Sequence, residues 1–183
     1  RDWFGKGRRL LERPFNEVLE SGKPDFPLCL GWANHSWSKK TWTAKNEGDT
    51  KSKLVEQTYI ESEFVDHFYD VLPAFKDKRY ITCEKKPVFF IYRPLEIPDV
   101  RHFIELWRQL AKENGLEGIY FVAMLGRLYD AKGSDEMYQK MIQSGFDALN
   151  VVNAYEAAVM DLKIRLIRKV FYKWLKCIPD LRP

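Results

Sequence analysis

The chain has 183 residues, of which 45% are hydrophobic and 15% aromatic, so it can bury a sizeable core and a disordered chain is excluded. A formal net charge of +4 is too small to indicate nucleic-acid binding, and no nucleic-acid-binding motif accompanies it. Cys29, Cys83 and Cys177 lack paired spacing, which excludes a disulfide framework and a zinc site and favours a reducing, cytoplasmic compartment.

The length favours a single domain over residues 1–183. No uninterrupted apolar run is long enough to cross a bilayer, and no histidine pair has metal-ligand spacing. A glycine-rich phosphate loop and an Asp-X-Asp metal motif are also missing from the sequence, so we expect neither a metal nor a cofactor. Because the chain begins at Arg1 rather than Met and ends at Pro183, we expect a fragment of a longer protein.

The first predicted element is a helix over residues 8–20, where apolar residues recur at helical spacing. Pro14 suits the first turn of such a helix, and Gly22 suits its C-terminal end. The apolar run from Phe26 to Leu30 predicts a buried strand. Residues 38–55 are polar and predict a long loop, which is either functional or a solvated insertion.

Further strands and helices alternate along the rest of the chain. The capping-box pattern Thr58-Tyr-Ile-Glu61 predicts a helix start, and Pro73 is expected to bend or end that helix. Asp99 and Ser134 each precede another predicted helix, with a glycine beyond its end. The predicted strands after the first are Val88–Tyr92, Ile119–Leu125 and Ala148–Val152.

Residues 160–177 predict an amphipathic helix with one apolar and one strongly basic side. One interpretation is an outer helix packed on the sheet. The alternative is a helix that lies on an anionic membrane surface, because aromatic and aliphatic residues opposite a Lys/Arg face suit that position. The cations that would contact the membrane are Lys163, Arg168, Lys169 and Lys173.

Four strand–helix units in succession predict an α/β domain with about four parallel strands, flanking helices and right-handed crossovers. The first strand ends in Trp32, Asn34, His35 and Trp37. Indole faces stack on the C–H face of a sugar ring, while amide and imidazole groups reach its hydroxyls. The pattern therefore suits a glycan, although the tryptophans would also fit the end of a buried core.

The segment Asp25-Phe-Pro-Leu-Cys-Leu-Gly-Trp-Ala-Asn34 resembles the Trp-Ala-Asn segment of WbsX-like proteins, which are related to glycoside hydrolase family 99 and occur in bacterial surface-polysaccharide gene sets. Further similar segments follow in the same order: Leu10-Leu-Glu-Arg-Pro14, Leu72-Pro-Ala-Phe-Lys-Asp-Lys-Arg-Tyr80, Lys86-Pro-Val-Phe-Phe-Ile-Tyr-Arg-Pro94 and Gly145-Phe-Asp-Ala148. The resemblance implies a (β/α)₈ barrel, of which four strands would be only a part.

Barrel enzymes carry their active sites at the C-terminal ends of the strands. Applied to the barrel that the resemblance implies, this rule selects Trp32, Asn34, His35, Trp37, Tyr92, Arg93, Arg127 and Asn150 as residues that bind a glycan or sugar substrate. The alternatives are that Tyr92 and Arg93 only end a strand and that Asn150 is a structural residue.

Glycoside cleavage usually needs two carboxyl groups. The similar proteins usually carry Glu where this chain has His35, and another Glu soon after Gly-Phe-Asp-Ala, where this chain has Leu149-Asn-Val-Val-Asn153. Glu156 is the nearest later carboxylate and our candidate for a catalytic acid. The resemblance implies a glycosyltransferase-like or glycosidase-like protein of O-antigen or capsule biosynthesis. The alternatives are a non-catalytic glycan-binding remnant and a peripheral membrane protein.

Overall fold

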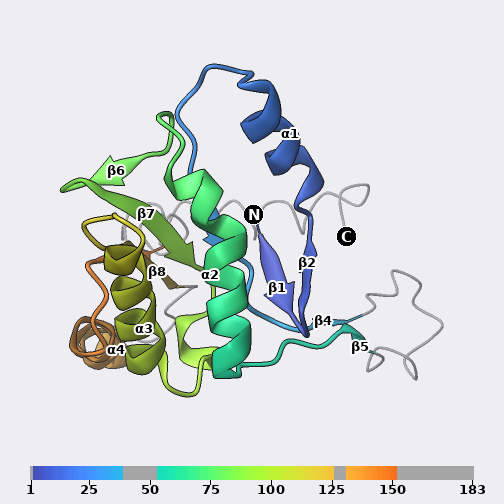
Figure 1. Cartoon of the computed structure of the whole chain (residues 1–183). Coiled ribbons are helices and arrows are strands. Elements are labelled where there is room, and N and C mark those ends of the chain that lie inside the picture. Colours follow the sequence, from blue (N-terminus) through green and yellow to red (C-terminus); the bar gives the residue numbers. More distant parts are fainter. Residues whose placement is uncertain (1, 39–52, 126–130, 152–183) are drawn as a thin grey trace, which may run out of the picture.

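The computed structural model of the chain describes residues 2–38, 53–125 and 131–151 (Figure 1). Its centre is a sheet in which four neighbouring strands are parallel, in the order β3-β7-β8-β9. These strands are β3 (Leu30–Trp32), β7 (Lys86–Ile91), β8 (Tyr120–Leu125) and β9 (Ala148–Val151). The predicted α/β class with four parallel strands is confirmed, and the arrangement is consistent with part of a barrel.

Two helices cover one face of this sheet. They are α2 (Glu61–Phe75) and α3 (Val100–Glu113), which pack against each other in Figure 1. The face they cover includes Trp32 of β3, Ile91 of β7 and Ala123 of β8, because these residues are aligned across the parallel strands. All three are buried in one aromatic core with Phe103 and Trp107 of α3. No helix within the described ranges is long and apolar enough to cross a membrane.

Helix α2 begins differently from its prediction. Its N-cap is Ile60, which makes no side-chain capping bond, and Thr58 Oγ1 instead donates to Glu63 at 2.7 Å. The expected capping box therefore does not form. Pro73 lies inside the last turn and the helix ends at Phe75, two residues later. The prediction for α3 is confirmed, since the Asp99 side chain accepts from the His102 amide at its N-terminus.

Residues 3–10 form a hairpin that the sequence did not predict. Strands β1 (Trp3–Gly5) and β2 (Arg8–Leu10) pair antiparallel around Lys6 and Gly7, both with positive φ. Helix α1 therefore begins only at Arg13 and ends at Ser21, so the predicted helix over 8–20 was wrong in its first turn. Pro14 lies in the first turn and Gly22 adopts φ 66° at the C-cap, as expected.

The strand predicted at Phe26–Leu30 begins later, at Leu30. Pro24 and Pro27 lack the amide hydrogens that a strand ladder needs, and Phe26 is 70% exposed. Short β6 (Thr82–Cys83) pairs antiparallel with β7, and β4 (Trp37–Ser38) pairs with β5 (Lys53–Val55) at the two ends of the predicted loop. The remaining described elements are the 3₁₀ turn η1 (Pro94–Glu96) and α4 (Ala131–Gln143).

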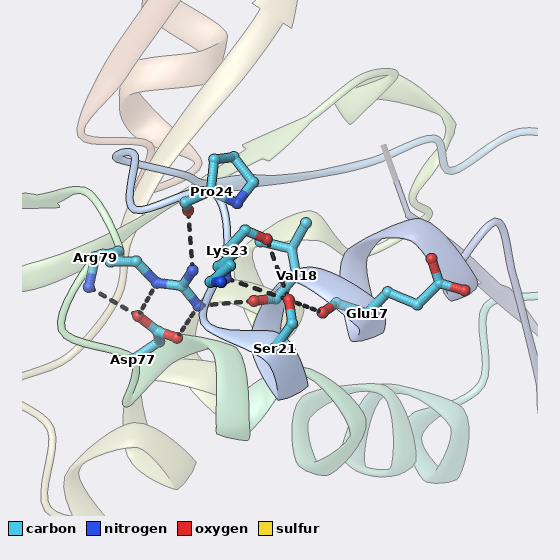
Figure 2. A network of polar contacts seen from close by, with 7 residues as sticks. All are labelled: Glu17, Val18, Ser21, Lys23, Pro24, Asp77 and Arg79. Atoms are coloured by element: carbon cyan, nitrogen blue, oxygen red, sulfur yellow. Dashed lines mark hydrogen bonds and ion pairs between the residues drawn. The ribbon is translucent and has the colours of Figure 1, made fainter.

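Arg79 anchors the end of α1 to the rest of the molecule (Figure 2). Its guanidinium donates to the carbonyl oxygens of Val18 at 2.9 Å and Pro24 at 3.1 Å. The same group pairs with both carboxylate oxygens of Asp77, at 3.0 and 2.7 Å. Because α1 contributes no fully buried residue, this one guanidinium is a main attachment of the helix.

Candidate functional site

His35 and Tyr92 lie side by side where two neighbouring parallel strands end. The backbone continues the pairing beyond β3 and β7, since the Tyr92 amide donates to the Trp32 carbonyl at 3.1 Å. The two rings are consequently close, with centroids 5.3 Å apart and planes tilted by 40°. Both residues are half-buried.

Arg93 and Glu96 extend this pair along the turn after β7. The Arg93 guanidinium carbon lies 5.9 Å from the centre of the Tyr92 ring, within cation–π range. Arg93 Nη1 also pairs with Glu96 Oε1 at 2.5 Å. The ion pair neutralises Arg93 and leaves its other N–H groups as hydrogen-bond donors, so the cluster offers polar contacts without a large net charge.

Tyr59 borders the cluster from the segment before α2. Its hydroxyl donates to the Asn34 carbonyl oxygen at 2.7 Å. Burial, together with the nearby negative charge of Glu96, raises the pKa of the Tyr59 hydroxyl to about 12. Tyr59 is therefore protonated at neutral pH and acts as a donor.

Asn34 was predicted to bind substrate, and the structure gives it another role. Its side chain is fully buried, and it makes two hydrogen bonds with Arg93. Nδ2 donates to the Arg93 carbonyl and Oδ1 accepts from the Arg93 amide, both at 2.8 Å. The amide group thus joins the two strand ends and presents no polar atom to a ligand.

Trp32 is also placed in the core. Its side chain is 1% exposed and its ring contacts Tyr59, Phe64, His67 and Phe103. It faces α2 and α3, whereas the other face of the same strands carries Gly31 and Phe90. The alternative that this tryptophan closes a core is therefore favoured over sugar stacking. Trp37 is half-buried, and its ring centroid lies 6.0 Å from that of Trp3.

The remaining predicted residues are spread more widely. Asn150 is exposed on β9, and the strand register places it on the same face of the sheet as Phe90 and Tyr92, with β8 between. Arg127, Glu156 and the basic residues Lys163, Arg168, Lys169 and Lys173 lie outside the described residues. The structure thus brings together His35, Tyr92 and Arg93 of the predicted set.

A buried charged network beneath the strand end was not predicted. His67 Nε2 lies 2.7 Å from Asp2 Oδ2, and Arg9 Nε lies 2.7 Å from Asp2 Oδ1. Asp2 also holds β3 by its backbone, because its amide donates to Gly31 O and its carbonyl accepts from Ala33 N. The sequence carried one indication of this network, because His67 falls on the apolar face of α2 between Phe64 and Phe68.

Comparison with known families decides what kind of protein carries this site. The family model described as "Glycosyltransferase WbsX" matches residues 2–175. The chain belongs to the WbsX glycosyltransferase family.

The curated relatives of this WbsX-family chain include a protein from two strains of Xanthomonas campestris, called "Uncharacterized protein WxcX". It is 25% identical over 124 residues, which is 68% of this chain and 17% of the relative. The chain therefore spans less than a fifth of the length of the curated relatives it matches. No solved structure matches the chain.

Proposed function

We propose that the chain binds a surface-polysaccharide glycan at the strand-end cluster, which we define as His35, Tyr92 and Arg93 with Tyr59 and Glu96, and that it serves in glycosyl transfer. The observation that carries this proposal is the juxtaposition of His35 and Tyr92 at the C-terminal ends of neighbouring parallel strands. Barrel and other parallel α/β proteins place their ligand sites at that edge.

The side chains of the cluster match the chemistry of a sugar. A half-buried Tyr92 ring offers an apolar face to the C–H groups of a pyranose, and its hydroxyl offers both a donor and an acceptor. The His35 imidazole and the Arg93 guanidinium add further polar groups for sugar hydroxyls. Because Glu96 balances the charge of Arg93, a neutral glycan suits the cluster better than a strongly anionic one.

Catalysis would use the His35 imidazole together with a carboxylate. His35 occupies the position at which similar proteins usually carry Glu, and an imidazole can act as a general base near neutral pH. Glu96 is already paired with Arg93, so we assign it to holding that guanidinium rather than to proton transfer. We keep Glu156 as the candidate acid, and a non-catalytic glycan-binding protein is the alternative if the chain binds a glycan without turnover.

The experiment is to incubate the 183-residue chain with a panel of purified bacterial O-polysaccharides and capsules. Binding is measured by isothermal titration, and turnover by the release of reducing ends or by transfer to a fluorescent oligosaccharide acceptor. We expect binding to at least one polysaccharide, and turnover that is lost in Glu156→Gln. Binding without turnover would select the non-catalytic alternative, and absence of binding to the whole panel would contradict the proposal.

A further inference from the structure

We infer that Asn34 is a positioning residue, which fixes the backbone of Arg93 and thereby the distance between the His35 and Tyr92 rings. The inference rests on the proposed function of the strand-end cluster and adds the means by which that cluster is held. Asn34 is separated from Arg93 by 59 positions in the sequence, so the link is purely tertiary.

The geometry of the link is that of a paired amide. Both Asn34 side-chain atoms are used, one as donor and one as acceptor, and both bonds are 2.8 Å long. Two bonds to the amide and the carbonyl of the same residue restrain both its position and its orientation. A single hydrogen bond would leave the backbone of Arg93 free to rotate about it.

Burial makes this link strong. Asn34 has 0% exposure, so both polar atoms of its side chain depend on the Arg93 backbone for their hydrogen bonds. The Asn34 carbonyl is held in turn by the Tyr59 hydroxyl at 2.7 Å. Three segments that are distant in the sequence therefore meet at this residue: the end of β3, the turn after β7 and the lead into α2.

The residues adjacent to the link are the two aromatic residues of the strand-end cluster. His35 follows Asn34 directly, and Tyr92 precedes Arg93 directly. Both are half-buried, and their rings are 5.3 Å apart. The buried amide thus sets the spacing of two ligand-facing rings while taking no part in binding, which distinguishes positioning from ligation.

The chemistry of the link is specific to a neutral amide. An ionised Asp at position 34 could accept from the Arg93 amide, but its second oxygen would face the Arg93 carbonyl and repel it. A protonated Asp would restore a donor there. Burial favours the neutral carboxyl, so an Asn34→Asp variant should regain the native link as the pH is lowered.

The first arm of the test needs no ligand. Hydrogen exchange of the Arg93 amide is measured by NMR in the wild type, Asn34→Ala and Asn114→Ala. Asn114 is the matched control, because its Nδ2 donates to the Leu110 carbonyl at 2.8 Å at the far end of α3. We expect Asn34→Ala alone to speed Arg93 exchange by about tenfold or more. Unchanged Arg93 exchange in a folded Asn34→Ala protein would overturn the inference.

The second arm measures affinity for the tightest-binding polysaccharide of the panel. We expect Asn34→Ala, and Asn34→Asp at pH 7, to weaken binding by roughly tenfold, whereas Asn114→Ala keeps wild-type affinity. At about pH 5 the ratio of Asn34→Asp to wild-type affinity should approach one. Wild-type affinity in Asn34→Ala would overturn the positioning role and leave the proposed function standing. If the wild type binds no polysaccharide, the proposed function fails, and the exchange result alone then decides whether Asn34 fixes the backbone of Arg93.

Discussion

The imidazole Nε2 of His67 lies 2.7 Å from Asp2 Oδ2, and both side chains are 1% exposed. Phe4 stacks on the imidazole with ring centroids 4.8 Å apart, and Trp32 and Trp107 contact it at 5.0 and 5.1 Å. The pair therefore connects the N-terminal hairpin, strand β3 and helices α2 and α3. The stability of this end of the sheet therefore depends on a buried contact between His67 and Asp2.

Removing one partner of this pair should be strongly destabilising. His67→Ala leaves the Asp2 carboxylate buried with only Arg9 as a partner, and we expect a loss of about 3–5 kcal/mol in the free energy of unfolding. His102→Ala is the control, because His102 and Glu61 form a similar 2.7 Å contact at 48% and 66% exposure. That control should cost about 1 kcal/mol or less in urea unfolding. Equal losses in both variants would contradict the importance of burial here.

Stability should fall in acid. Burial alone would raise the pKa of Asp2, but the hydrogen bonds and charges of His67 and Arg9 outweigh it and hold that pKa below its ordinary value. Hydrogen bonds from Arg79 lower the pKa of Asp77 to about 2. Carboxylates with lowered pKa values contribute stability above their unfolded pKa and lose it as the pH falls through the folded pKa.

The predicted pH window thus runs from about pH 4, where unfolded carboxyls protonate, down through about pH 2. Urea unfolding at a series of pH values should show a wild-type stability that drops across this window and a shallower drop in Asp77→Asn. A wild-type stability that stays constant from pH 5 to pH 2 would show that these pairs do not form.

Trp32 should behave as a core residue. Trp32→Ala removes a side chain that is 1% exposed, and we expect a loss of about 3–5 kcal/mol in unfolding free energy. Trp32→Phe should be tolerated far better, because it keeps a ring and removes an indole N–H that finds no hydrogen-bond partner among the described residues. A folded Trp32→Phe protein should keep wild-type glycan affinity. A tenfold loss of affinity in that folded variant would restore the sugar-stacking interpretation.

Arg79 should control the attachment of α1. Replacing it with Ala or Lys removes the forked donor that joins the carbonyls of Val18 and Pro24 to Asp77, so the segment around residues 22–25 should open more often. We expect limited proteolysis there to be several-fold faster than in the wild type. Arg13→Ala is the matched control, because the Arg13–Glu17 pair on α1 is 87% and 62% exposed and should change the cleavage rate little.

Local patterns in the sequence were sufficient for the parallel sheet and its helices. Phe64, Phe68, Phe103 and Trp107 recur at helical spacing and are all buried, and the apolar runs of β7 and β8 are covered strands. The first hairpin was missed because its strands have only three residues each and carry no clear alternation. Strand β3 begins at Leu30 rather than at Phe26 because Pro24 and Pro27 interrupt the ladder, and an apolar run alone does not reveal this.

The site was only partly predictable, for a physical reason. The strand-end rule selected His35, Tyr92 and Arg93, which the fold does bring together. The rule could not show that Trp32 and Asn34 are buried while these three residues form a cluster. Which side chains at a strand end face the helices depends on the sheet register. The role of Asn34 depends on backbone groups 59 positions away, which leave no pattern in its own neighbourhood.

Tyr92 and its neighbours at the ends of β3 and β7 are the residues that we propose bind a glycan. The most direct test is isothermal titration of the tightest-binding panel polysaccharide into the wild type, Tyr92→Ala and Tyr69→Ala. Tyr69 is the matched control, since it is 48% exposed on α2 and lies outside the strand-end cluster. We predict that Tyr92→Ala weakens binding by roughly tenfold or more while Tyr69→Ala binds as the wild type does. Undiminished binding by a folded Tyr92→Ala protein would contradict the claim.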